Sequence, residues 1–67
     1  MRLITETLRV EGMRCGSCEN TVERALRQLR GVRRAKADYG AETVVVTYDA
    51  KRCNTFQIFK ALELKGY

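Results

Sequence analysis

The chain contains no histidine, no proline and no tryptophan, and only three of its 67 residues are cysteine. Without histidine it lacks the commonest general base and transition-metal ligand, so acid–base or metal chemistry must rest on cysteine, carboxylate or tyrosine side chains. No stretch approaches the ~18 apolar residues of a membrane span, and residues 1–6 lack the apolar core of a secretory signal. We therefore expect a cytoplasmic protein that does not insert into a membrane, with reduced thiols.

The composition is that of one small globular domain. A chain of this length buries only about 60% of the surface that it exposes when unfolded, which excludes a large enzyme with a deep pocket. With 45% hydrophobic and 31% charged residues it should fold, and without linker or repeat we expect a single domain over residues 1–67. Its net charge of +5 would attract nucleic acid, anionic lipid or an acidic protein face. The sign of the charge alone does not distinguish among these three kinds of partner.

Hydrophobic periodicity predicts five elements in the order βαββα. These are a strand over residues 5–10, a helix over 17–30, strands over 32–39 and 42–48, and a second helix from Asn54 to Gly66. The short step at Gly40 and Ala41 predicts that the second and third strands form an antiparallel hairpin. The run Val44–Val46 is apolar on both faces, so the third strand is predicted to be central.

Side-chain patterns predict which faces are buried. In the first strand Ile4, Leu8 and Val10 should point inward, interrupted by Glu6. In the first helix Cys18, Val22, Ala25, Leu26 and Leu29 should face the core and Glu19, Glu23, Arg24, Arg27 and Arg30 the solvent. Glu23 and Arg27 form an i,i+4 pair, and Gly31 should end the helix. In the second helix Asn54 and Gln57 suit a capping box, with Ile58, Phe59 and Leu62 inward.

The element order predicts an α+β sandwich of the ferredoxin-like type. A right-handed crossover places the third strand between the first and second, which is a split βαβ unit with two helices on one face of an antiparallel sheet. The complete version has a fourth strand, which we expect here to be short or absent. The first strand would then be an open edge that can pair with another chain and form a homodimer.

The segment 12–18 carries the chemistry. It places Cys15 and Cys18 in a CxxC pattern between the first strand and the first helix, so that two sulfurs can converge on one exposed point. A free cysteine has a pKa of about 8.5, which a helix N-terminus or a nearby cation lowers to roughly 3.5–7.5. We expect the helix to act on Cys18 and Arg14 to supply the cation, so that thiolates form at neutral pH.

Two thiolates favour a soft metal ion. Thiolates select Cu(I), zinc or iron–sulfur clusters, but two alone do not complete the four-ligand shell of structural zinc, and no second CxxC or histidine is present. Low coordination suits Cu(I) or mercury better. It also leaves room for an incoming thiolate from another protein, which ligand exchange requires. Cys15 and Cys18 are therefore the predicted metal ligands of a carrier, and no enzymatic activity is predicted.

The pattern resembles the heavy-metal-associated domain family, which includes small copper chaperones and the N-terminal domains of metal-transporting P-type ATPases. The resemblance spans residues 8–67 and rests on Gly-Met-x-Cys-x-x-Cys after a strand, the Gly-Val step that follows the helix, and the Gly-Tyr end. It implies Cys15 and Cys18 as ligands, Met13 as a core plug under the loop, and Tyr67 near the metal. Zinc-handling members often carry Asp where this chain has Arg14, which favours copper. The implied partner is a metal-transporting P-type ATPase or another protein of the family.

Other readings stay open beside Cu(I) transfer. Members that bind mercury share the motif, and a Zn(II) or Cd(II) carrier is an alternative, as is a small dithiol oxidoreductase, although a chain without proline cannot provide the cis-proline of thioredoxin-type enzymes. Nucleic-acid binding is not expected, because the third strand offers only Tyr48 for stacking. Cys53 should lie at the pole opposite the CxxC pair, where it could still bridge two chains. A metal-bridged homodimer is a further route to assembly. A basic surface for an acidic partner is predicted at Arg14, Arg24, Arg27 and Lys65.

Overall fold

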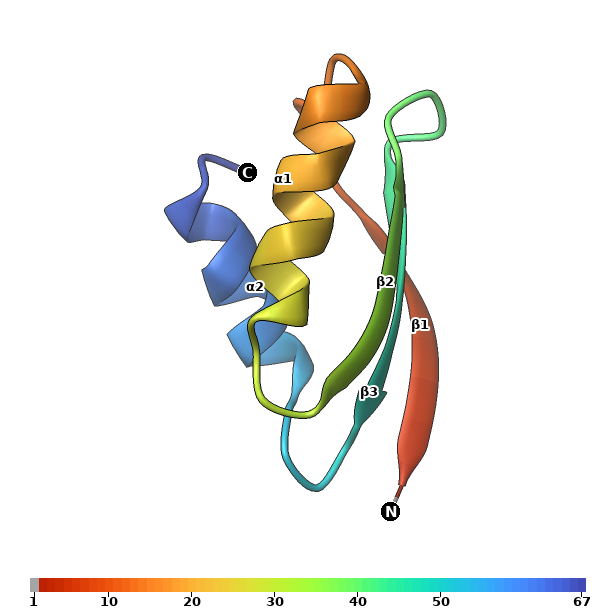
Figure 1. Cartoon of the computed structure of the whole chain (residues 1–67), viewed down its shortest axis with the longest axis vertical. Coiled ribbons are helices and arrows are strands. Elements are labelled where there is room, and N and C mark those ends of the chain that lie inside the picture. Colours follow the sequence, from red (N-terminus) through yellow and green to blue (C-terminus); the bar gives the residue numbers. More distant parts are fainter. Residues whose placement is uncertain (1) are drawn as a thin grey trace.

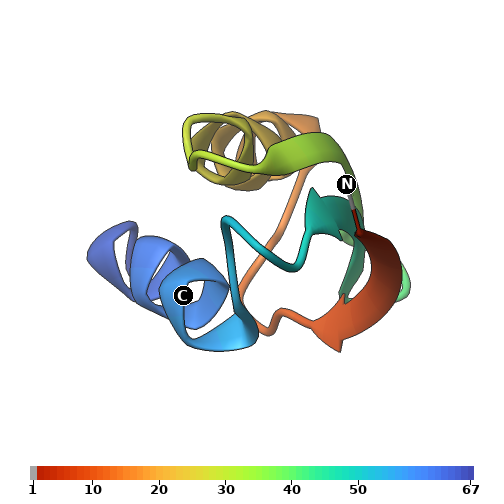
Figure 2. The same cartoon turned by 90° about the horizontal axis from the view of Figure 1, so that it is seen from below.

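Two helices cover one face of a three-stranded sheet in the computed structural model, which describes residues 2–67 (Figure 1). The elements are β1 (Leu3–Arg9), α1 (Gly16–Arg27), β2 (Val32–Asp38), β3 (Thr43–Asp49) and α2 (Thr55–Leu64). Seen along the strands, the helices lie side by side and the other face of the sheet is uncovered (Figure 2). The predicted element order and ferredoxin-like arrangement are confirmed. Within residues 2–67, no helix has the length and hydropathy that a membrane span needs.

The sheet has the order β1-β3-β2, and both neighbouring pairs are antiparallel. Strand β3 is therefore central, as the valine run predicts. Val44 and Val46 are fully buried under the helices, whereas Val45 is 39% exposed on the uncovered face. The described residues form three strands, so the outer edge of β1 has no strand beside it in this part of the chain.

The core lies between the sheet and the two helices. Its largest fully buried side chains are Leu26, Ile58, Val22, Val44 and Val46. Leu8 and Val10 are buried as predicted, but Ile4, which lies nearer the chain start, is 37% exposed. Glu6, which interrupts the inner face of β1, accepts a hydrogen bond from the hydroxyl of Tyr48. The Glu6 carboxylate thus has a hydrogen-bond partner on the neighbouring strand.

Helix α1 is shorter at its C-terminal end than the pattern over residues 17–30 indicates. It ends at Arg27, and Gly31 follows with a φ of +96° after three residues of turn. A Cβ at Gly31 would lie 2.8 Å from the Cβ of Arg52, so a glycine is needed both for the left-handed conformation and for the close approach of the two loops. The turn brings the chain after α1 against the loop that precedes α2.

Glu23 corrects the predicted solvent face of α1. Its carboxylate is buried, accepts a 2.8 Å hydrogen bond from the backbone N–H of Ala37 and binds Arg27 at 3.0 Å. Glu19 likewise accepts from the backbone N–H of Tyr39 at 2.9 Å. The helical periodicity places Glu19 and Glu23 on the polar face of α1. It does not show that this face lies against the open edge of β2, where backbone N–H groups need acceptors. The predicted Glu23–Arg27 pair itself is confirmed.

Helix α2 begins with the predicted capping box. Gln57 N–H donates to the Asn54 side chain at 2.9 Å, and Asn54 N–H donates to the Gln57 side chain at 3.2 Å. Ile58 and Leu62 are buried, but the predicted burial of Phe59 is wrong because its side chain is 51% exposed. A helix that rests on one layer buries a single narrow stripe, and Phe59 lies about 100° away from Ile58 around the axis.

Candidate metal centre

The two thiols meet at the pole where β1 leads into α1. Gly12 turns the chain with a φ of +98°, and Met13 then inserts into the core with 6% of its surface exposed. The buried Met13 anchors the loop and leaves the residues after it at the surface. Its predicted place as a core plug is confirmed. The chain then enters α1, whose N-cap residue is Cys15.

The sulfur atoms of Cys15 and Cys18 are 3.9 Å apart. Cys15 is exposed and Cys18 is partly buried, and neither forms a disulfide. Both belong to the first turn of α1: the backbone N–H of Cys18 donates to the Cys15 carbonyl at 3.1 Å. The N-cap and the third helical residue lie on the same side of a helix, so the CxxC spacing converges the sulfurs without any tertiary contact. The resulting pair is open to solvent on the Cys15 side.

Hydrogen bonds to its sulfur lower the pKa of Cys15 from 9.0 to about 7. The Ser17 hydroxyl, 3.0 Å from the sulfur, is the largest cause, followed by the backbone N–H groups of Cys18 and Ser17. The backbone N–H groups at the start of α1 therefore contribute to lowering the pKa of Cys15, an effect that the sequence pattern does not predict. The cation predicted at Arg14 is not among the causes.

Ser17 is a site residue that the sequence pattern does not predict. A hydroxyl residue inside a CxxC at a helix start is the available signal, because such a residue can reach the sulfur of the N-cap position two residues earlier. In the sequence alone, a serine at that position is equally typical of an ordinary helix N-terminus. Only the conformation of the loop shows that its hydroxyl lies beside the Cys15 sulfur.

Tyr67 lies beside the thiol pair, as the family resemblance implies. Its ring is 3.5 Å from the position that a Cβ on Gly12 would occupy, and it packs against the edge of the core. A hydrogen bond with Cys18 is the largest cause that raises the pKa of the Tyr67 hydroxyl, with burial and the charge of both cysteines adding to it. The phenol therefore stays protonated beside the sulfurs at neutral pH. Tyr67 therefore lies beside Cys18, which is the less exposed of the two thiols.

Cys53 is remote from this centre. The loop between β3 and α2 that holds it lies at the opposite pole from the loop between β1 and α1 (Figure 1). Its side chain is 4% exposed, and burial raises the pKa of its thiol. Across residues 2–67 no three Cys, Asp or Glu side chains gather closely enough to hold a metal. Among the described residues the centre thus offers the two sulfurs of Cys15 and Cys18.

The predicted basic surface is only partly assembled. Arg24 and Lys65 line a common groove of about 190 Å³ between the helices. Arg27 is paired with Glu23, which reduces the charge that it presents to a partner. Arg14 is exposed in the loop before Cys15. Two of the four predicted cations therefore share one concave surface.

The chain belongs to the heavy-metal-associated domain family, whose sequence model matches residues 7–67. It is 42% identical over 65 residues to the copper chaperone CopZ of Staphylococcus haemolyticus, covering 97% of this chain and 96% of CopZ. It is 34% identical over 58 residues to the copper-exporting P-type ATPase of Bacillus subtilis, covering 87% of this chain but 7% of the ATPase. The structure of oxidised MerP from Ralstonia metallidurans CH34 superposes with a TM-score of 0.92 at 32% identity, covering 97% of this chain and 92% of MerP.

Proposed function

We propose that this domain binds a soft metal ion, Cu(I) in the first place, between Cys15 and Cys18 and passes it to another protein. The observation that carries the proposal is the 3.9 Å separation of two sulfurs at an exposed tip. Metal–thiolate bonds are about 2.3 Å long in zinc sites, so one ion of similar size bound to both sulfurs needs them no more than about 4.6 Å apart. The site meets that limit before any ion is added.

Ligand exchange follows from the unequal exposure of the two thiols. An incoming thiolate can approach the ion from the Cys15 side, where the site is open, and add as a third ligand. Cys15 can then leave as a thiolate, because the Ser17 hydroxyl and two backbone N–H groups stabilise its negative charge. Cys18 would leave last, since Tyr67 and α1 restrict access to it. No redox change occurs at the metal in this sequence.

The proposed partners are metal-transporting P-type ATPases and other proteins of the same family. The similarity to CopZ over nearly its whole length and to a segment of a copper-exporting ATPase supports this class of partner. The groove with Arg24 and Lys65 would favour an acidic docking face and a salt-sensitive association rate. We further propose a cytoplasmic location, and a homodimer bridged by metal or by the edge of β1 as an alternative assembly.

The test is titration of the reduced protein with Cu(I) against a chromophoric competing chelator. The expected stoichiometry is one ion for each thiol pair, and Cys15→Ser/Cys18→Ser should remain folded and lose tight binding. Cys53→Ser is the matched control, because it removes a thiol at the opposite pole and should bind as the parent does. Tight binding retained by the double variant would overturn the proposal.

Three alternatives have support of their own. A mercury carrier is supported by the similarity to MerP, and a Zn(II) or Cd(II) carrier by the affinity of thiolates for these ions. Titrations in which Hg(II), Zn(II) or Cd(II) competes with Cu(I) for the site rank the four ions by affinity. A dithiol oxidoreductase is supported by the low pKa of Cys15 beside a second thiol. Reduction of insulin that disappears in Cys18→Ser would favour this activity, and its absence would favour the carrier.

A further inference from the structure

A groove runs along the seam between α1 and α2, which lie side by side and in opposite directions (Figures 1 and 2). It consists of three adjoining hollows of about 230, 280 and 190 Å³, and each hollow shares lining residues with the next. The first hollow begins at Phe56, near the start of α2, and the last ends at Arg24 and Lys65. The groove therefore follows α2 over its whole length.

The groove is open because the two helices present small side chains to each other there. Ala25 of α1 and Ala61 of α2 line the same hollow of about 280 Å³. A methyl group at each position fills less of the space between two helices than the larger side chains that pack the core. The seam is therefore left accessible to side chains of another molecule.

Large apolar side chains form the rim of the groove. Phe56 and Leu64 line the hollow of about 230 Å³, and the two residues are 70% and 79% exposed. Leu29, which follows α1, lines the same hollow from the other side of the seam. Exposed apolar groups that gather at a concavity are typical of a protein–protein contact.

Every charged side chain that lines the groove is cationic. These are Arg24, Lys60 and Lys65, and within residues 2–67 none of the three forms an ion pair. The ammonium of Lys60 lies 5.9 Å from the centre of the Phe56 ring, at the apolar end of the groove. The groove thus combines an apolar surface with positive charge that no carboxylate of the chain neutralises.

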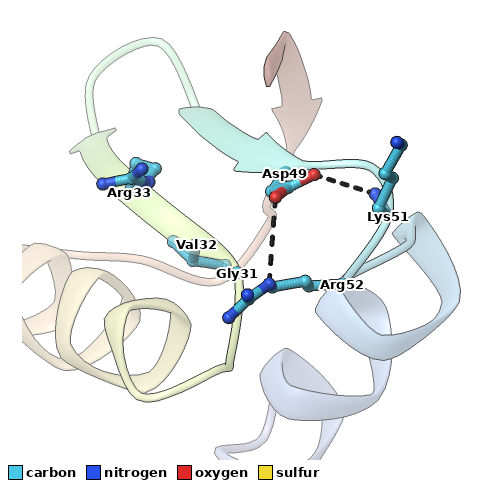
Figure 3. A pocket seen from close by; sticks show the side chains of 6 residues that line it. All are labelled: Gly31, Val32, Arg33, Asp49, Lys51 and Arg52. Atoms are coloured by element: carbon cyan, nitrogen blue, oxygen red, sulfur yellow. Dashed lines mark hydrogen bonds and ion pairs between the residues drawn. The ribbon is translucent and has the colours of Figure 1, made fainter. Parts of the chain in front are cut away.

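The hollow between the two loops at the opposite pole has a different charge balance (Figure 3). Its volume is about 490 Å³, and its lining includes the carboxylate of Asp49. That carboxylate lies 4.0 Å from the Nε of Arg52 and accepts a hydrogen bond from the backbone N–H of Lys51. Positive charge in this hollow is therefore partly compensated within the chain, unlike the charge along the helix seam.

We propose that the groove binds an amphipathic, acidic helix of a partner protein. Leucine or aromatic side chains at positions i, i+3 and i+7 of that helix would enter the hollows between Phe56 and Leu64. Its carboxylates would pair with Lys60 beside the apolar end and with Arg24 and Lys65 at the other end. A helix of about ten residues matches the length of α2, because each residue advances about 1.5 Å along the axis.

The groove would hold a partner without contacting the metal ion. Its basic end coincides with the acidic docking face proposed above, whereas its apolar end begins at Phe56, at the pole opposite the thiols. A partner helix could therefore stay bound while the ion is exchanged at the tip. The kind of partner rests on the proposed function, but binding of the helix requires no metal.

Charge and shape favour a helix over two other occupants. A symmetric dimer brings the same surface of both copies together, so Lys60 and Lys65 would face like charges from the second copy. A flat bilayer surface would contact the exposed rim but leave the hollows unfilled. An acidic amphipathic helix supplies both the side chains that fill the hollows and the opposite charge.

The test is an amide chemical-shift titration of the ¹⁵N-labelled, metal-free full chain with a capped helical peptide. The peptide carries leucine at positions i, i+3 and i+7 and glutamate at the flanking positions. We expect saturable shifts along residues 24–29 and 56–65, and none with a peptide of the same composition whose leucines are scattered around the helix. Equal binding of both peptides, or no saturation by the first, would overturn the proposal.

Two further measurements test the other occupants. We expect no binding to phosphatidylglycerol vesicles and a monomer in sedimentation equilibrium. Vesicle binding that Phe56→Ala abolishes would overturn the proposal in favour of a membrane surface. Dimerisation that Leu64→Ser abolishes would overturn it in favour of a second copy of the chain.

Two matched pairs of variants locate the site. Phe56→Ala and Phe59→Ala each remove an exposed ring from α2, but Phe56 lines the groove and Phe59 does not. Phe56→Ala should weaken peptide binding about tenfold, which is typical of an interface anchor, and Phe59→Ala by no more than about twofold. Lys65→Gln should weaken binding and reduce its dependence on salt, whereas Lys51→Gln, outside the groove, should do neither. Equal losses within either pair would refute a defined groove.

Cu(I) titration of the same variants separates this proposal from the metal site. Phe56→Ala and Lys65→Gln should keep the Cu(I) stoichiometry of the parent, because neither residue supplies a thiolate. Peptide binding without Cu(I) binding would refute the proposed metal function alone, and Cu(I) binding without peptide binding would refute the groove alone.

Discussion

Ser17→Ala should raise the pKa of Cys15 and slow every reaction of its thiolate. The Ser17 hydroxyl is the largest of the causes that bring this pKa from 9.0 to about 7, and alanine removes it without removing the backbone donors of α1. The sulfur would keep its place 3.9 Å from Cys18, because the helix backbone and not the hydroxyl positions it. The substitution therefore changes the pKa of Cys15 without changing the separation of the two sulfurs.

The size of the effect follows from the ionised fraction. At pH 7 a thiol with a pKa of about 7 is about half ionised, whereas at 9.0 it is about 1% ionised, so complete loss of the shift would lower the thiolate population about fiftyfold. Ser17 is one of four hydrogen-bonding causes, so Ser17→Ala should fall between these limits. Because the Cys15 sulfur of the parent has the lower pKa, protons compete less with a metal ion for it than in Ser17→Ala. The parent should therefore bind metal better at low pH.

The assay is the pH dependence of alkylation at Cys15 by iodoacetamide, with Cys15 distinguished from Cys18 by tandem mass spectrometry. Ser17→Thr keeps a hydroxyl at the same position and serves as the matched control. A curve for Ser17→Ala that superposes on the parent would refute the assigned role of Ser17. A curve for Ser17→Thr that follows Ser17→Ala would show that a hydroxyl at this position is insufficient.

Three further predictions test the fold that positions the site, each by chemical denaturation. Gly31→Ala should destabilise by about 1–3 kcal/mol, because alanine is strained at a φ of +96° and its Cβ would lie 2.8 Å from that of Arg52; an unchanged midpoint would contradict the close approach. Glu23→Ala should cost about 1–3 kcal/mol by leaving a buried N–H of β2 unpaired, and Glu23→Gln should recover part of it if the bond is as described. Ile58→Ala should cost about 2–5 kcal/mol, whereas Phe59→Ala, on the exposed side of α2, should cost far less; equal losses would argue that Phe59 is covered in solution.

Much of the fold could be predicted from local pattern. Strand alternation, helical spacing and the Asn54 capping box predict all five elements, and the valine run predicts that β3 is central. The CxxC spacing at a helix start likewise predicts converging thiols, because residues three apart in a first turn share a side. These features depend on residues that are close together in the sequence, so the local sequence is enough to predict them.

Other features depend on which elements become neighbours in space. The pattern places Glu23 on a polar face, but only packing makes that face the edge of β2, where a backbone N–H needs an acceptor. The burial of Phe59 was wrongly predicted, because the sequence does not say which stripe of α2 meets the sheet. The close approach of Gly31 and Arg52, which are 21 positions apart, arises through tertiary contact alone. Local backbone preference thus determined the elements and the thiol pair, while side-chain packing decided the acceptors, the exposed faces and the approach of the two loops.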